Sequence, residues 1–240
     1  MIPIISISSL STLPLLVFIS VSLFFSFKET RSKNIGYFFG GMFFLTLMFM
    51  FTSTPGLLLK DPRQISAVFA IYPSLIFLGV AFWGAIPLNI LKKRNFEIAF
   101  ILFFFTVAIV TAVINLDNAK DAIVYQQSPF IYWEDTRGAA MNLFIGILTG
   151  LTLIYLSLFF LINGFRSSDK YVKSRSFLVG SGLAVFIIGV VINFVFGASN
   201  SPYKYIGTVI STCVGVLSCI MIFIGVRKKN KFLDESTEVQ

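Results

Sequence analysis

Seven long apolar stretches, separated by short polar turns, constrain this chain more than any other feature. Each is close to or above the ~20 residues that a helix needs to cross a bilayer. Hydrophobic residues make up 56% of the chain and charged residues only 12%, whereas an average soluble domain carries roughly 25% charge. The sequence therefore predicts an all-α membrane protein that folds as a bundle of seven transmembrane helices. The predicted helices cover residues 4–27, 35–59, 65–91, 97–115, 138–163, 176–196 and 203–226.

The basic residues are unevenly divided between the turns. Fourteen of the 19 lie in alternate turns that begin after the first segment: Lys28, Arg31, Lys33, Lys92, Lys93, Arg94, Arg166, Lys170, Lys173, Arg175, Arg227, Lys228, Lys229 and Lys231. The other five are Lys60, Arg63, Lys120, Arg137 and Lys204. Because cytoplasmic loops of membrane proteins carry an excess of Lys and Arg, we expect the N-terminus outside and the C-terminus in the cytoplasm. Residues 1–229 then form the membrane domain, and residues 230–240 form a cytoplasmic tail.

The longest polar interruption covers residues 116–137, between the fourth and fifth helices, and the charge pattern places it outside. Two β-prone runs, AIVYQ at 122–126 and FIYW at 130–133, flank a turn signal at Ser128 and Pro129. The pattern predicts a short β-hairpin that lies over the outer face of the bundle.

Uncharged polar and aromatic side chains gather at this outer depth. The candidate ligand-binding residues are Tyr72, Tyr125, Tyr132, Trp133, Asn142 and Asn193. Tyr72, Asn142 and Asn193 would line an outward-facing pocket. The three aromatic residues of the outer loop, Tyr125, Tyr132 and Trp133, would form an aromatic floor for the ligand. The alternative is that the amides bond between helices and the aromatic rings form an interfacial belt.

Small residues at helical spacing mark candidate sites of close helix packing, because they let backbones approach one another. These candidates are Gly36, Gly40, Gly146, Gly150, Ser211 and Gly215.

The ionisable residues exclude several kinds of chemistry. The chain has no histidine, which removes His-based metal sites and Ser-His or Cys-His catalysis. No charged residue falls at mid-membrane depth and no carboxylate is expected to be buried, so a proton-coupled pump is disfavoured. No lysine lies between Tyr205 and Val226 to carry retinal. We expect neither enzymatic activity nor a cofactor or metal. The net charge of +8 lies at segment ends, which indicates membrane topology rather than nucleic-acid binding.

The layout also carries a resemblance. A β-prone outer loop ends in the run FIYWE at 130–134, and a basic inner loop leads into a sixth helix that holds Gly189 and Asn193. Over residues 10–226 this resembles the N-terminal seven-helix sensor region of bacterial and archaeal histidine kinases and related signalling proteins. The resemblance implies a sensor-like module in the cytoplasmic membrane of a prokaryote. In that family the seventh helix continues into a coiled coil and an effector domain. Here thirteen residues follow Arg227, so we expect a signal to pass to a separate partner.

These observations predict a non-enzymatic, sensor-like or accessory membrane module. It would bind an unidentified ligand outside and shift the sixth and seventh helices, whose basic ends meet a protein partner or anionic lipid. One alternative is a structural subunit of a larger membrane complex, with the small residues as its contacts. Another is a facilitator for a small neutral solute.

Overall fold

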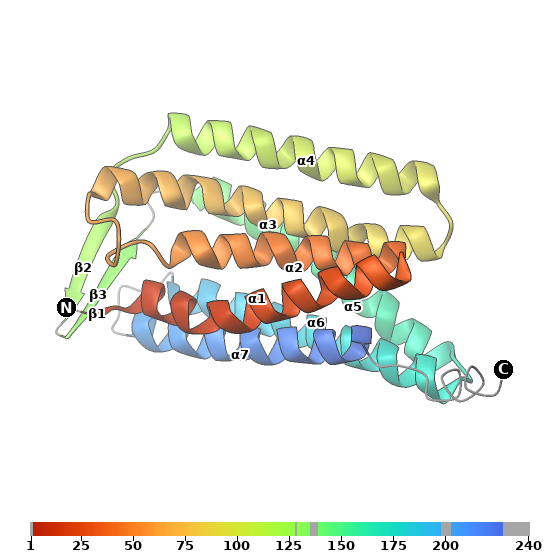
Figure 1. Cartoon of the computed structure of the whole chain (residues 1–240). Helices are drawn as coiled ribbons and strands as arrows, with labels where there is room; N and C mark the ends of the chain where they lie inside the picture. Colours follow the sequence, from red (N-terminus) through yellow and green to blue (C-terminus); the bar gives the residue numbers. More distant parts are fainter. Residues whose placement is uncertain (1, 128, 135–138, 198–202, 228–240) are drawn as a thin grey trace.

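Seven α-helices make up most of the protein (Figure 1). The computed structural model describes residues 2–127, 129–134, 139–197 and 203–227, so the predicted tail at 230–240 lies outside the described residues. Each helix is long and apolar enough to cross a bilayer, which confirms the prediction of an all-α membrane protein with seven such helices. The helices are α1 (Ile4–Thr30), α2 (Lys33–Thr52), α3 (Pro62–Ile90), α4 (Arg94–Asp117), α5 (Ala139–Arg166), α6 (Lys170–Gly197) and α7 (Tyr203–Arg227).

Six of the helices form a closed ring. In order of contact they are α1, α2, α3, α5, α6 and α7, and α7 packs back against α1. Helix α4 lies at one edge of the bundle beside α3 (Figure 1). In the most apolar part of each helix, 61% of the α3 residues are buried but only 22% of the α4 residues. Helix α3 is therefore enclosed by its neighbours, whereas α4 turns most of its surface outward.

The largest apolar cluster fills the ring, and a second one lies among α3, α4 and α5. The nearly inaccessible side chains of the largest cluster come from all six helices and include Leu16, Met42, Ile86, Leu156, Leu183 and Ile222. Close helix approach is visible where the Trp83 ring lies on Gly41, because a Cβ atom there would fall 2.0 Å from the Trp83 Nε1. Bulky and small side chains thus interlock, as expected where lipid provides no hydrophobic driving force between helices.

A small sheet covers one end of the bundle. Its strands are β1 (Ile2–Pro3), β2 (Ile123–Gln127) and β3 (Phe130–Glu134), in the order β1-β3-β2. Strand β2 runs antiparallel to β3 with Val124 opposite Trp133, and β1 pairs parallel to β3 on its other side. The backbone N–H of Ile2 donates to the Pro129 carbonyl at 2.8 Å. Two N-terminal residues carry no strand pattern of their own, so this third strand was not predicted.

Helix α2 is shorter than predicted. It ends at Thr52 rather than near residue 59. Pro55 has no N–H for a helical hydrogen bond, and Gly56 adopts the left-handed region at φ 76°, which glycine enters without steric cost. These two residues turn the chain away from the helix axis before α3 begins.

Helix α6 begins six residues earlier than predicted, at Lys170. The Asp169 carboxylate accepts a hydrogen bond from the backbone N–H of Tyr171 at 2.7 Å, which satisfies one of the free donors at a helix start. Residues interpreted as loop are therefore the first turns of a helix, and Arg175 has a fixed position on it.

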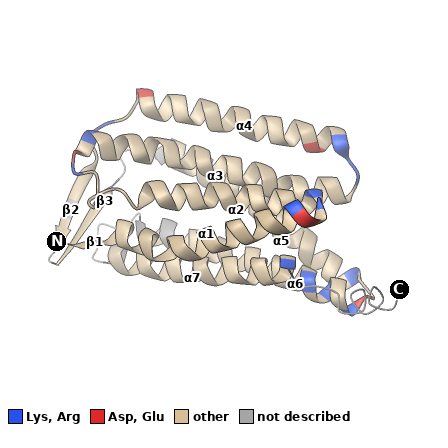
Figure 2. Cartoon of the chain, in the orientation of Figure 1, with Lys and Arg blue, Asp and Glu red and all other residues tan. Residues whose placement is uncertain are grey.

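The charged residues divide the bundle into two ends (Figure 2). The sheet end comprises β1 to β3, the turn between α2 and α3, the end of α4, and the first turns of α5 and α7. The basic end comprises the turns that join α1 to α2, α3 to α4 and α5 to α6, together with the last turn of α7. Most Lys and Arg residues of the described part lie at the basic end.

Candidate functional site: the sheet end and the basic end

Trp133 packs the sheet against the helices. It is buried in a cluster with Ile65 and Phe69 of α3. Gly56 lies against the same ring, because a Cβ atom there would fall 3.0 Å from the Trp133 Nε1 and 2.7 Å from Pro3 Cβ. The N-terminus, the α2–α3 turn and β3 therefore meet around one indole. The Nε1 of Trp133 has no hydrogen-bond partner in the described structure, so this ring acts by packing.

The opposite face of β3 contacts α7. The ring of Phe130 lies 5.6 Å, centroid to centroid, from that of Tyr205, and the Tyr132 ring lies 6.1 Å from it at nearly a right angle. Successive residues of a strand point to opposite faces, so Tyr132 and Trp133 face different helices. The sheet therefore lies between α3 and the first turn of α7 and contacts both.

The predicted ligand-binding residues do not converge on one surface. Tyr72 borders the cluster around Trp133, whereas Tyr132 faces α7. Asn142 lies half-buried in the first turn of α5. The side chains of Tyr125 and Asn193 lie outside the described residues. An aromatic floor made jointly by Tyr132 and Trp133 is not what the structure shows, because the two rings lie on opposite faces of β3.

Several uncharged polar residues at the sheet end make hydrogen bonds between segments. The hydroxyls of Ser9 and Thr52 join α1 to α2 at 3.0 Å. The amide of Asn115 donates across to the Ala70 carbonyl at 3.3 Å, joining α4 to α3. For these residues, the structure shows the interhelical bonding that the sequence left as one of two interpretations.

The predicted packing residues separate into two groups. A Cβ atom at Gly36 would meet the Phe27 ring at 2.9 Å, and one at Gly40 would meet the Phe82 ring at 2.7 Å, so both make close contacts within the chain. The corresponding positions at Gly146, Gly150 and Gly215 meet nothing within 4 Å. The sides of α5 and α7 that carry these three glycines face open space, so no described helix of this chain packs closely on them, and their contact with a partner helix stays a prediction.

Hydroxyl groups join α6 to both of its neighbours. Ser211 and Ser218 of α7 donate to the carbonyls of Gly189 and Gly182 at 2.8 and 2.7 Å. From the other side, the Ser157 hydroxyl of α5 donates to the Gly180 carbonyl at 2.8 Å. Glycine lets the partner helix come close enough to reach its carbonyl. Ser211 therefore makes a close contact between α7 and α6 of this chain. For the contacts of Ser157 and Ser218, the run GSG at 180–182 was the available sequence signal.

A buried carboxylate lies at the basic end, contrary to the expectation from sequence. Glu97, in the first turn of α4, is 3% exposed. It accepts hydrogen bonds from the Lys33 ammonium at 3.0 Å and from the Tyr37 hydroxyl, both on α2. Lys33 and Tyr37 are one helical turn apart and so share a face. This ion pair ties the outlying α4 to the ring. In the sequence, the available signal for this ion pair was Glu97 itself, the single acid that follows Lys92, Lys93 and Arg94.

Arg175 closes the end of α7. Its Nε donates to the Gly225 carbonyl at 3.0 Å and one terminal nitrogen donates to the Val226 carbonyl at 2.9 Å. The last carbonyls of a helix have no partner within the helix, and a cation near them interacts favourably with the helix dipole. The other terminal nitrogen, Nη1, has no hydrogen-bond partner among the described residues.

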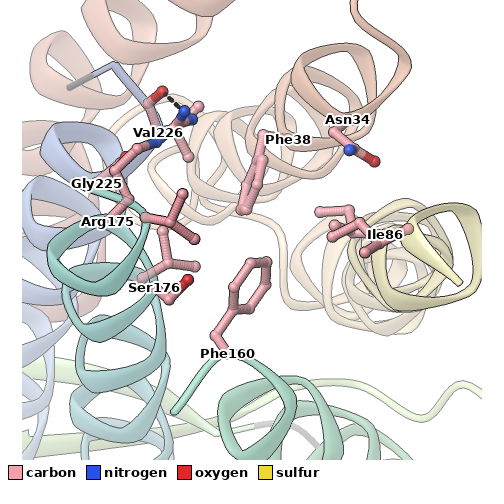
Figure 3. A pocket seen from close by; sticks show the side chains of 11 residues that line it. Asn34, Phe38, Ile86, Phe160, Arg175, Ser176, Gly225 and Val226 are labelled. Atoms are coloured by element: carbon pink, nitrogen blue, oxygen red, sulfur yellow. Dashed lines mark hydrogen bonds between the residues drawn. The ribbon is translucent and has the colours of Figure 1, made fainter. Parts of the chain in front are cut away.

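A cleft of about 180 Å³ opens at the basic end between α2, α3, α5, α6 and α7. Figure 3 shows the lining residues Phe38 and Phe160 pointing toward each other, and their ring centroids are 6.1 Å apart, as in a packed aromatic pair. Arg175 and Asn34 lie on opposite sides (Figure 3). The lining residues are Asn34, Phe38, Ile86, Ile90, Phe160, Val172, Arg175, Ser176, Val179, Gly225 and Val226.

Seven membrane-length helices, six of them packed around a common apolar core, define a membrane protein of the helical-bundle class. In comparisons with known proteins, the chain matches no family model and no curated protein. Among the described residues, no three His, Cys, Asp or Glu side chains gather as metal ligands would.

Proposed function

We propose that the protein is a non-enzymatic membrane module of the sensor-like or accessory kind. The sheet end receives a signal outside the cell, α6 and α7 carry it, and a protein partner reads it at the cytoplasmic basic end. The excess of basic residues at that end supports this orientation. The cytoplasmic membrane of a prokaryote is the proposed location.

The observation that carries this proposal is the contact of Phe130 and Tyr132 with Tyr205. It joins the sheet to the first turn of α7. Helix α7 is then bonded to α6 along its length, and Arg175 holds its far end. A ligand acts through such a connection only if it favours one of two arrangements of the moving element. The proposed element is the α6–α7 pair.

Cys219 gives a native probe for this coupling. It is buried at 2% exposure on α7, about 21 Å along the helix from Tyr205 at ~1.5 Å per residue. In a Cys213→Ser background, we expect Tyr205→Ala to raise the rate of Cys219 modification by N-ethylmaleimide several-fold, because the α6–α7 packing loosens. Ile123→Ala, at an exposed position of β2, is the control. Equal rates in both variants would argue against the proposed coupling.

The open glycines of α5 favour a second candidate, a structural subunit of a larger membrane complex. Gly146 and Gly150 meet nothing within 4 Å, which leaves room for the close approach of another protein's helix. A stoichiometric complex that purifies with the wild type and is lost in Gly150→Leu would support this candidate. No observation on the described helices favours a solute facilitator, because core side chains fill the centre of the ring.

A further inference from the structure

We infer that the cleft at the basic end binds one anionic phospholipid, with the acyl chain between the helices and the phosphate beside Arg175. The inference goes beyond the proposed sensing role. It rests on the proposed membrane orientation, with the basic end in the cytoplasm, but does not require that the protein carries a signal.

The cleft has an apolar interior. Phe38, Phe160 and Val179 are each less than 10% exposed and belong to the core of the ring. Ile90 and Val172 lie nearer the outside, where they are 44% and 43% exposed. An apolar wall that runs from the helix ends to the core suits a hydrocarbon chain, since dispersion contacts accumulate along its length.

Polar groups at the cleft are hydrogen-bond donors. After capping α7, Arg175 Nη1 has no hydrogen-bond partner among the described residues, and the guanidinium lies over the Tyr171 ring, 5.5 Å from its centroid. The Asn34 side chain accepts a bond from Asn89 at 2.8 Å through its oxygen, and its own amide N–H groups have no partner among the described residues. Ser176 adds a hydroxyl. Donors of this kind suit the oxygens of a phosphate, and arginine pairs with phosphate in particular.

The surrounding charge selects an anionic headgroup. The basic side chains of the described basic end are Lys28, Arg31, Lys33, Lys92, Lys93, Arg94, Arg166, Lys170, Lys173, Arg175 and Arg227. Its acids are Glu29, Glu97 and Asp169, and none of the described residues that line the cleft is acidic. Glu97 is paired with Lys33, and Asp169 caps the start of α6. Basic pockets between transmembrane helices on the cytoplasmic side are suited to anionic lipid headgroups.

Trp83 can report on the cleft. It is 4% exposed, and its Nε1 lies 3.5 Å from the carbonyl oxygen of Phe38, which lines the cleft. In a Trp133→Phe background it is the only tryptophan. The protein is reconstituted into phosphatidylcholine vesicles that contain either brominated phosphatidylglycerol or phosphatidylcholine with the same brominated chains. We expect several-fold stronger quenching of Trp83 by the phosphatidylglycerol, because the headgroup draws its chain into the cleft.

Two neighbouring substitutions localise the effect. Ile90→Phe narrows the cleft and should remove the headgroup preference, whereas Leu91→Phe, at an exposed residue outside the lining, should keep it. Both substitutions leave the hydrogen bonds from Arg175 to the end of α7 intact. A difference between the two variants therefore reports on the cleft and not on folding. Arg175→Gln should also lose the preference. Equal quenching by the two lipids, or a preference that survives Ile90→Phe, would overturn the inference. Capture of a second copy of the chain by a photoreactive group at position 90, in place of lipid, would also overturn it. None of these results depends on the Cys219 measurement.

Discussion

Trp133 at the sheet end and Glu97 at the basic end are both nearly inaccessible, yet they are held in opposite ways. The indole is enclosed by apolar side chains, and its Nε1 makes no hydrogen bond in the described structure. The carboxylate is held by an ammonium and a phenol from a neighbouring helix. The Trp133 indole is therefore held by packing, whereas the Glu97 carboxylate is held by directed polar contacts.

The described residues of the basic end also line a cleft. Side chains that interlock by shape leave little empty space. Arg175 and the Glu97 pair instead join helix ends through a few hydrogen-bonded contacts. The two ends should consequently respond differently to substitution, and four measurements test this.

The largest effect is expected at Trp133. Trp133→Ala should lower the free energy of unfolding by about 3 to 5 kcal/mol, because it leaves a cavity among Ile65, Phe69 and Gly56. Trp133→Phe should cost much less, since it keeps most of the packing and removes an N–H that has no partner. Denaturant titration in mixed micelles measures both. If Ala and Phe were equally costly, the sheet end would depend on a polar contact of the indole, and the contrast between the ends would fail.

Tyr37 gives the next effect, at the basic end. Tyr37→Phe removes one of the two donors to the buried Glu97, so we expect a loss of about 2 kcal/mol, as for hydrogen bonds to charged groups. Tyr155→Phe serves as the matched control, because Tyr155 is exposed on α5 and makes no side-chain hydrogen bond in the described structure. The same titration compares the two variants. Equal stabilities would mean that Glu97 is held by Lys33 alone.

A smaller loss is expected for Arg175. Arg175→Gln weakens the cap on the last carbonyls of α7, and we expect a cost of about 1 kcal/mol in lipid-free micelles. Arg166→Gln removes an exposed charge at the end of α5 and should leave stability unchanged. Thermal unfolding followed by circular dichroism distinguishes the two. An equal decrease in both variants would indicate a general charge effect rather than a cap.

The smallest change in the free energy of unfolding is expected on the open side of α5. Gly146→Ala should leave the free energy of unfolding unchanged or raise it by up to about 1 kcal/mol, because alanine favours helix and the added methyl meets nothing. Gly40→Ala is the matched test, since its Cβ would fall 2.7 Å from the Phe82 ring, and it should destabilise the protein. A destabilised Gly146→Ala would show that this side of α5 is covered by another molecule.

The residues at the two ends were not equally predictable. Trp133 drew notice because it stands in a β-prone run within a polar loop, and the structure places it where that loop meets α3. Its role as an enclosed packing residue was not evident, because Gly56 and Pro3 come from distant parts of the chain. Arg175 was counted only as one of many basic residues, since nothing local shows that it reaches Val226.

The sequence by itself determined the number of membrane-length helices, most of their boundaries and the uneven distribution of basic residues. Each of these follows from local hydrophobicity, local charge or local backbone chemistry. Tertiary structure decided which face of each element is buried. It alone brought Glu97 to Lys33, added β1 to the sheet and directed Tyr132 and Trp133 to different helices. Those outcomes depend on residues far apart in the chain, whose proximity is settled only when the helices pack.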